Sequence, residues 1–416
     1  MAPPISFGLG LSLARAGGGT LNPDELSLDL AFALDKTLAA RQGPTPTFTR
    51  ASTATFVGSD GLIQSAAINE PRFDHDPITL VSKGLLIEES RTNVLNGNSE
   101  NLSGSGWAGA GVANNDPLIA DPTGTVGGVY YVTVSEKICN FNGSGNVMCI
   151  SFFAKQRSGG GNGVTIQIFR NTTAPALSLG TQTFLFTGTM IPSSNFSSLT
   201  RTEYPNGWYR FTAFVTAPSG AFNSSARIDI EGAVSSNYTW GIDIGAGSFS
   251  TSYTPTIDAP LTRSADVCSI TGADFTSFYN QSEGTMLVNA VTPASGDRTV
   301  LSTDDNTANE MIRLRTEGTN PLFKVTDGGS EVVAIDAGTV TANTAFKLAG
   351  AYKLDDFASS ISGGAAVTDT SGTLPTVDRM RIGEGQGGNT MRGHIARIQY
   401  FRKRLSNAKL QTLTAP

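Results

Sequence analysis

Two stretches decide the fold of this chain: WGIDIGAGSFSTSYTPTIDAPLTRSADV at residues 240–267 and GHIARIQYFRKRLSNAKLQTL at residues 393–413. Each is typical of the closing segment of a β domain. In the first, a strand pattern passes into a connector rich in Pro and Thr. In the second, a strand is followed by one short terminal helix, for which Ser406 is a suitable N-cap. Together they predict two β sandwiches in tandem, in a protein that binds rather than catalyses.

The composition of the 416-residue chain also favours an all-β protein. Charged residues make up only 15% of the sequence, below the usual ~25%, and 47 glycines accompany abundant Thr, Ser and Asn. This is typical of short strands joined by tight turns. The net charge of −6 argues against a nucleic-acid partner. No run approaches the roughly 18 apolar residues of a membrane-spanning helix, so membrane insertion is not expected.

Changes in the hydrophobic pattern divide the chain into four regions. Residues 1–24 are rich in Gly and Pro without a period, and we expect them to anchor the protein to a larger assembly, the alternative being a tail without fixed structure. Residues 25–90 form an extended β region with few internal partners, which is expected to pair between chains of an oligomer. Residues 91–262 carry five strand-like runs and predict a jelly roll. Residues 263–416 carry seven and predict a concanavalin A-like or laminin-G-like sandwich with a short C-terminal helix.

Cysteine and histidine usage gives no sign of a cofactor. Cys139, Cys149 and Cys268 make neither a disulfide framework nor a metal set, and we expect buried, reduced thiols. His75 and His394 lie far apart in the sequence, so neither a zinc site nor a His-based triad is expected. We therefore expect no cofactor.

Aromatic residues are the candidates for sugar binding, because sugar rings stack on aromatic faces. Trp208 and Trp240 each open an alternating strand pattern and are expected in the core. Trp107 lies in the glycine-rich run SGSGWAGAG, where it is either exposed or plugs the sandwich. Tyr130 and Tyr279 are the further carbohydrate-binding candidates.

The carboxylates predict no catalytic pair. A glycoside hydrolase needs two carboxylates about 5–10 Å apart across the sugar bond. Glu88 and Glu89 are adjacent, so on a strand they point to opposite faces, and we expect no enzyme. Asp297, Asp304 and Asp305 flank one predicted strand and are candidate calcium ligands at the rim of the second sandwich. Loop Asp residues are also common for turn geometry alone.

Several long motifs follow one another in a fixed order along the chain. They are GPTPTFTRASTATFVGSDGLIQSA (43–66), EPRFDH (70–75), GLLIEESRTNVL (84–95), NGWYRFT (206–212) and TRSADV (262–267). This set resembles a family of tailed-bacteriophage virion proteins of the tail-fibre, head-fibre or spike type. The resemblance covers residues 25–416. At residues 241–245 the chain has GIDIG, whereas the family often has a GAQLE-type sequence, so no role tied to that acidic position is transferred.

The resemblance implies a structural protein located in the virion. Its N-terminal segment would contact other virion proteins, its sandwiches would attach to a glycan on the host surface, and the assembly would be a homotrimer. Two alternatives stay open. One is a capsid-decoration or collar protein that binds no receptor, and the other is a tailspike enzyme that degrades glycans.

Overall fold

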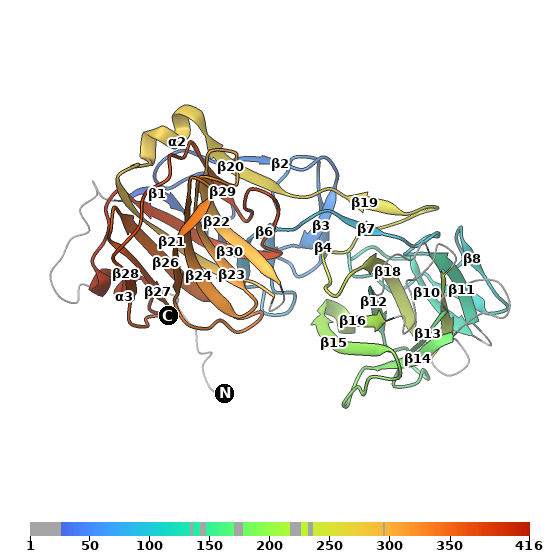
Figure 1. Ribbon diagram of the computed structural model, residues 1–416. Helices are drawn as coiled ribbons and strands as arrows, with labels where there is room; N and C mark the ends of the chain where they lie inside the picture. The colour runs from blue at the N-terminus through green and yellow to red at the C-terminus, as the bar shows by residue number, and fades with distance from the viewer. Residues whose placement is uncertain are drawn as a thin grey trace, which may run out of the picture.

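The computed structural model describes residues 26–133, 136–141, 147–169, 178–216, 226–231, 236–293 and 296–416. The predicted anchoring segment 1–24 lies outside these ranges. Within them the protein is built almost entirely from strands, arranged as two separate β sandwiches (Figure 1). The predicted all-β class with two sandwiches is therefore confirmed.

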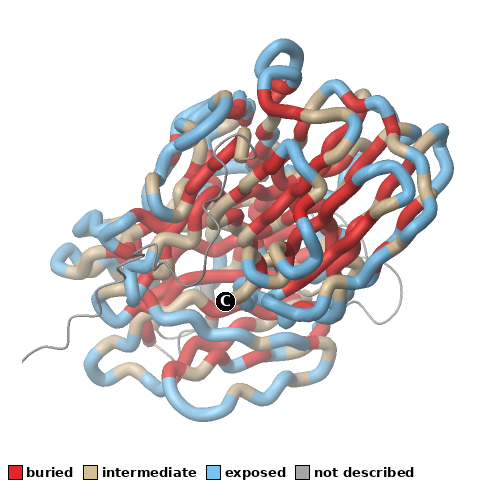
Figure 2. The backbone as a smooth tube through the Cα atoms, turned by 90° about the vertical axis from the view of Figure 1, so that its left-hand side faces the viewer, coloured by how far each residue is buried: buried red, intermediate tan, exposed pale blue. Residues whose placement is uncertain are grey.

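One sandwich, here called the terminal sandwich, contains both ends of the described chain. Its first sheet has the order β28 (Val367–Asp369), β27 (Phe357–Ile361), β26 (Phe346–Lys353), β21 (Glu283–Val291), β30 (Gly393–Phe401), β6 (Ser82–Ile87) and β5 (Phe73–His75), and β1 (Leu26–Leu30) also pairs with β30. Its second sheet has the order β2 (Thr47–Thr49), β20 (Val267–Thr271), β29 (Arg379–Ile382), β22 (Asp297–Asp304), β23 (Met311–Glu317), β24 (Asn320–Asp327) and β25 (Ser330–Asp336). Buried residues run along these strands, whereas exposed residues concentrate in the loops (Figure 2).

The N-terminal strands differ from the prediction in their partners. Leu28 of β1 pairs with Tyr400, and Phe48 of β2 pairs with Cys268. The apolar alternation in residues 25–90 was read correctly as strands, but the division at residue 90 does not separate them from the last sandwich. Their apolar faces are buried within the same chain. Pairing between chains of an oligomer stays a prediction.

The second sandwich is a jelly roll inserted into the first, and is here called the inserted sandwich. One sheet has the order β15 (Phe196–Tyr204), β16 (Trp208–Thr216), β12 (Val147–Lys155), β18 (Tyr238–Ala246), β10 (Val129–Thr133) and β9 (Val112–Asp116). The other has the order β14 (Ser178–Leu185), β13 (Gly163–Phe169), β17 (Ala226–Glu231), β11 (Glu136–Phe141) and β8 (Trp107–Ala108). As predicted, Trp208 and Trp240 are buried, and the three cysteines are free and buried.

The chain enters and leaves the inserted sandwich through one ribbon. Strand β7 (Arg91–Asn93) leads in, β19 (Leu261–Arg263) leads out, and the two pair antiparallel. The hairpin of β3 (Ala54–Val57) and β4 (Ile63–Ala66) lies beside this ribbon, between the two sandwiches (Figure 1). Two segments that are 168 residues apart in sequence thus form a single junction.

Helices are few and short in the described ranges. They are α1 (Phe32–Asp35), α2 (Gly272–Phe278), α3 (Asn407–Thr414) and the 3₁₀ turn η1 (Pro205–Gly207). The predicted terminal helix is confirmed as α3, and the Ser406 hydroxyl accepts a hydrogen bond from the Lys409 amide as its N-cap. None of the described helices is long and apolar enough to cross a membrane.

The position of β1 in the terminal core gives a direct stability test. Leu28 is fully buried, whereas Leu34 in the same segment is 62% exposed. Leu28→Ala should lower the free energy of unfolding by about 2–5 kcal/mol, because it leaves a cavity between the sheets. Leu34→Ala should change it by less than about 0.5 kcal/mol. Urea unfolding of both variants checks this, and equal effects would contradict the assignment of β1 to the core.

Candidate functional site

A cleft of about 820 Å³ lies between the two sandwiches. One wall is the outer face of the six-stranded sheet of the inserted sandwich. Along β16, Phe211, Ala213 and Val215 point into the core, so the residues between them face outward. The cleft-lining residues of β16 are Arg210, Thr212, Phe214 and Thr216.

The neighbouring strand and the connector add many hydroxyl groups to this wall. Thr200 and Thr202 of β15 lie beside Thr212 and Arg210 in the register of the sheet. The segment that leaves the inserted sandwich, Ser248–Tyr253, also lines the cleft. Lining hydroxyl residues from β15 and this connector are Ser197, Ser198, Thr200, Thr202, Tyr204, Ser248, Ser250, Thr251, Ser252 and Tyr253.

The opposite wall comes from the terminal sandwich. It is formed where β6 and β30 run side by side and by the loops after β21 and before β26. Its lining residues include Lys83, Leu86, Glu88, Thr292, Asn343, Arg392 and His394. The cleft therefore exists only because the insertion holds one sheet of the jelly roll opposite this edge of the terminal sandwich.

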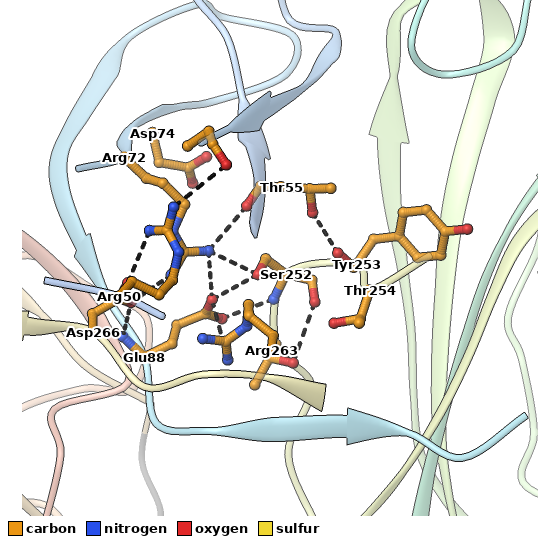
Figure 3. Close-up of polar contacts among 12 residues, drawn as sticks. Arg50, Thr55, Arg72, Asp74, Glu88, Ser252, Tyr253, Thr254, Arg263 and Asp266 are labelled. Atoms are coloured by element: carbon orange, nitrogen blue, oxygen red, sulfur yellow. Dashed lines mark hydrogen bonds and ion pairs between the residues drawn. The ribbon is translucent and has the colours of Figure 1, made fainter. Parts of the chain in front are cut away.

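A buried group of five charged side chains stands behind the cleft, here called the arginine cluster: Arg50, Arg72, Arg263, Glu88 and Asp266 (Figure 3). Arg72 contacts the carboxylates of Glu88 at 2.8 Å and Asp266 at 2.5 Å. Arg50 contacts Asp266 at 3.1 Å, and Arg263 lies 3.6 Å from Glu88. Burying charges is costly unless they are paired, and here every charge has an opposite partner.

Three arginines face two carboxylates, so the cluster holds one positive charge in excess. Backbone carbonyl groups accept several of the remaining N–H donors, although Nε of Arg72 and Nε of Arg263 are buried without a hydrogen-bond partner among the described residues. Arg72 donates to the Thr55 carbonyl at 2.9 Å, Arg50 to the Ala67 carbonyl at 2.7 Å, and Arg263 to the Glu89 carbonyl at 2.6 Å. These partial negative charges offset the excess and fix the local backbone.

The arginine cluster also reaches the connector of the inserted sandwich. The Ser252 amide and hydroxyl donate to Glu88 at 2.8 and 2.7 Å, and the Thr55 hydroxyl donates to the Tyr253 carbonyl (Figure 3). Burial alone would raise the pKa of the Glu88 carboxyl, but Arg263, Arg72 and the bonds from Ser252 outweigh it and hold that pKa well below its ordinary value. Glu88 is therefore ionised at any physiological pH.

The two histidines, far apart in sequence, have different partners: His394 contacts a buried carboxylate and His75 contacts a backbone carbonyl group. His394 Nε2 lies 2.8 Å from Asp74 Oδ2, and His75 Nδ1 lies 3.2 Å from the Val57 carbonyl. Burial would raise the pKa of Asp74, but His394 and the Val57 amide hold it below its ordinary value. No group of three or more potential metal ligands (His, Cys, Asp or Glu) occurs among the described residues.

A second buried carboxyl, Asp243, lies under the same sheet. It accepts a hydrogen bond from the Thr254 amide at 2.9 Å, next to a cavity of about 10 Å³ that also borders Arg91 and Arg210. Burial raises the pKa of Asp243 to about 6, although the two arginines act in the opposite direction. Asp243 thus changes charge within the physiological range.

The sequence-predicted aromatic residues do not line the cleft. The indole of Trp107 is half-buried against the inserted core and donates to the Asn98 carbonyl at 2.7 Å. Tyr130 is half-buried against the same core. Their sugar-binding role stays a prediction, and it would lie elsewhere on the inserted sandwich.

Tyr279 is a correction to the predicted site. Its ring is buried and stacked between Phe275, with centroids 4.4 Å apart, and Tyr400, at 5.2 Å. Burial raises the pKa of its phenol to about 12. A sugar cannot reach a ring face that other aromatic rings already cover.

The calcium candidates are also separated by the structure. Asp297 and Asp304 stand at opposite ends of β22, roughly 23 Å apart at the rise of a strand. Asp304 is buried and pairs with Arg381 at 2.9 Å, while Asp297 pairs with Arg315 at 2.9 Å. Asp305 accepts hydrogen bonds from Thr307 within its own turn. The three residues therefore do not form one site.

Sequence reasoning missed Thr202, Phe249 and Arg392, which do line the cleft. A signal existed for part of the wall: in WYRFTAFVT the polar residues alternate with the apolar ones, which indicates an open sheet face. The hydroxyl-rich run SFSTSYT was a second signal. No local pattern indicates that Arg392 lies opposite that face.

Solved structures show only partial similarity to this chain. No protein-family model and no curated protein matches the chain. A solved CBM40 module of a Ruminococcus gnavus IT-sialidase, bound to alpha2,3 sialyllactose, has 18% identity and a TM-score of 0.30 over 33% of this chain and 84% of that one. Domains LG4-5 of mouse laminin alpha1 have 10% identity and a TM-score of 0.24 over 76% and 88%. At these values the assignment of two sandwiches rests on the strand pairing itself.

The arginine cluster predicts a large cost for removing one member. Arg72→Met should lower the free energy of unfolding by roughly 3 kcal/mol or more, because Glu88 and Asp266 lose a buried partner. Arg41→Met is the matched control, since Arg41 pairs with Asp35 on the surface and exposed pairs contribute little. Urea unfolding measures both, and a neutral Arg72→Met would refute the structural role of the cluster.

Asp243 predicts a defined pH dependence. Its folded pKa lies above its ordinary value, so its contribution to stability is greatest at low pH and is lost as the pH rises toward about 6. Asp243→Asn should therefore gain stability relative to the natural protein between about pH 4 and pH 7, by about 2–3 kcal/mol. Denaturant unfolding across this range checks the difference. A constant difference would show that Asp243 titrates normally.

Proposed function

We propose that the cleft between the sandwiches binds a glycan. The observation that carries this proposal is the lining: many hydroxyl side chains lie on the walls, with apolar surface and the half-buried Phe214 and Phe249 among them. Hydroxyl groups both donate and accept hydrogen bonds, which suits the many hydroxyls of a sugar, directly or through water. The volume of about 820 Å³ lies within the range of small-ligand sites, about 300–1,000 Å³.

The wider role that we propose is attachment of a bacteriophage virion to its host. It is supported by the ordered motifs over residues 25–416 that resemble tail-fibre, head-fibre and spike proteins. Several weak cleft sites in a trimer would act together, and linked sites gain ~10²–10⁴ in avidity. In this proposal the protein is a virion component that binds host glycan and does not degrade it.

The carboxylates of the cleft favour binding over hydrolysis. Hydrolysis requires one carboxyl that holds a proton and a second that is free to react. Glu88 is held ionised by arginines, and Asp74 is engaged by His394. Neither has the environment of a general acid, which supports the non-enzymatic proposal.

A substitution that fills the cleft should test this function. Thr202 is exposed on β15 and lines the cleft, whereas Thr181 is exposed on β14 in the opposite sheet of the same sandwich. A glycan array first identifies the ligand of the intact protein. Thr202→Trp should then lower its affinity at least roughly tenfold by calorimetry, because the indole occupies the space of a sugar ring.

Thr181→Trp is the matched control and should leave the affinity within about twofold. Thermal unfolding shows that both variants are folded. If the array detects no glycan, or if the Thr181 variant loses affinity as strongly as the Thr202 variant, the cleft is not the glycan site.

A further inference from the structure

The cleft carries an unusual distribution of charge for an acidic protein. The whole chain has a net charge of −6. Charged or titratable side chains that line the cleft are Asp74, Lys83, Glu88, Arg210, Arg392 and His394. Which of these side chains can bind a ligand depends on the ion pairs and hydrogen bonds that each already makes within the protein.

Both acidic residues of the cleft are withdrawn from any ligand. The side chain of Glu88 is 6% exposed and is engaged by Arg72, Arg263 and Ser252. The side chain of Asp74 is 10% exposed and is engaged by His394 and the Val57 amide. Neither carboxylate is positioned to repel an anion in the cleft.

The basic residues are more accessible. The Lys83 side chain is 35% exposed, and its nearest ion-pair partner, Asp76, is 3.9 Å away. Arg210 donates to the Ser151 hydroxyl at 2.9 Å and to the Thr251 carbonyl at 2.7 Å. Among the described residues no carboxylate lies within ion-pair distance of Arg210. These two cations are therefore only partly compensated.

Arg392 stands at the meeting point of the two sandwiches. Its guanidinium carbon lies 3.6 Å from the ring centroid of Phe249, and that of Arg91 lies 4.3 Å from the same centroid. The Phe249 ring thus lies within reach of two guanidinium groups, one from the terminal sandwich and one from the junction ribbon. Glu89 engages Nε and Nη2 of Arg392, at 2.6 and 2.5 Å. Nη1 has no partner among the described residues.

Further charged groups lie around Phe249 and Arg392. Arg298 lies close enough to Arg392 to lower the pKa of its own guanidinium, after the larger effect of burial. Glu89 is in ion-pair contact with Arg392, whereas Asp243 acts electrostatically on Arg91 and Asp297 on Arg298. The group left for a ligand is Nη1 of Arg392, and a guanidinium is well suited to bind carboxylate or phosphate.

Building on the proposed glycan site, we propose that the ligand of the cleft is an anionic saccharide. Its acidic group, a carboxylate or a phosphate, binds Arg392 through Nη1 and is attracted by Lys83, while its hydroxyl groups contact the threonine wall of β15 and β16. Phe249 supplies the apolar surface beside the acidic group. A neutral sugar would leave these cations with no partner from the ligand.

The test uses the full-length protein and an array of matched saccharides. The pairs are sialyllactose with lactose, oligogalacturonate with its carboxyl-reduced form, and mannose 6-phosphate with mannose. We expect the acidic member of at least one pair to bind about tenfold or more tightly, and the identity of that pair separates carboxylate from phosphate. Equal or tighter binding of the neutral members overturns this inference and leaves the glycan site standing. Binding of no member overturns both.

Variants then connect the preference to named side chains. Arg392→Gln and Lys83→Gln should each reduce affinity for the acidic saccharide severalfold and leave that for its neutral partner unchanged. Lys83→Gln keeps the test valid if Arg392→Gln fails to fold, because Lys83 is partly exposed and weakly paired. Lys353→Gln, exposed at the far end of β26, is the matched control and should have no effect. An acidic preference that survives both cleft variants overturns the assignment.

Discussion

Three arginines and two carboxylates, all withdrawn from solvent, meet where the two sandwiches join. Their charges would be prohibitively costly to bury singly, and each is compensated only when four separate segments are in place. Arg50 and its partner Asp266 are 216 residues apart in sequence. The arginine cluster can therefore form only in the complete fold. The ribbon, the β3–β4 hairpin and the connector of the inserted sandwich must all be correctly placed.

This condition explains why an inserted domain can define a site with another domain. A single two-stranded ribbon would by itself leave the jelly roll free to turn. Hydrogen bonds from Ser252 to Glu88, and from Thr55 to the Tyr253 carbonyl, tie the connector to the cluster at several points. The outer face of β15 and β16 is thus held opposite the edge of β6 and β30. The shape of the cleft therefore depends on these buried ion pairs.

Burial and pairing also divide the polar residues of the cleft into two groups: those that stabilise the fold and those that face solvent. Glu88 and Asp74 are paired with other side chains of the protein. Thr202, Lys83 and Arg392 each have polar atoms that are free to bind a ligand. A face of mixed hydroxyl, aromatic and cationic groups is suited to the charged sugar proposed above as its ligand. In the function proposed above, this face holds a glycan without cleaving it.

The sequence by itself determined the all-β class, the strand runs of both sandwiches, the buried tryptophans and cysteines, and the terminal helix, because alternation and capping are local signals. Tertiary structure decided that Leu28 pairs with Tyr400, that Tyr279 is covered, and that the jelly roll is an insertion. Periodicity tells which face of a strand is apolar but not which strand covers it. Nor does it tell a buried, paired arginine such as Arg72 from a cleft residue such as Arg392, since the difference lies in partners that come from distant parts of the chain.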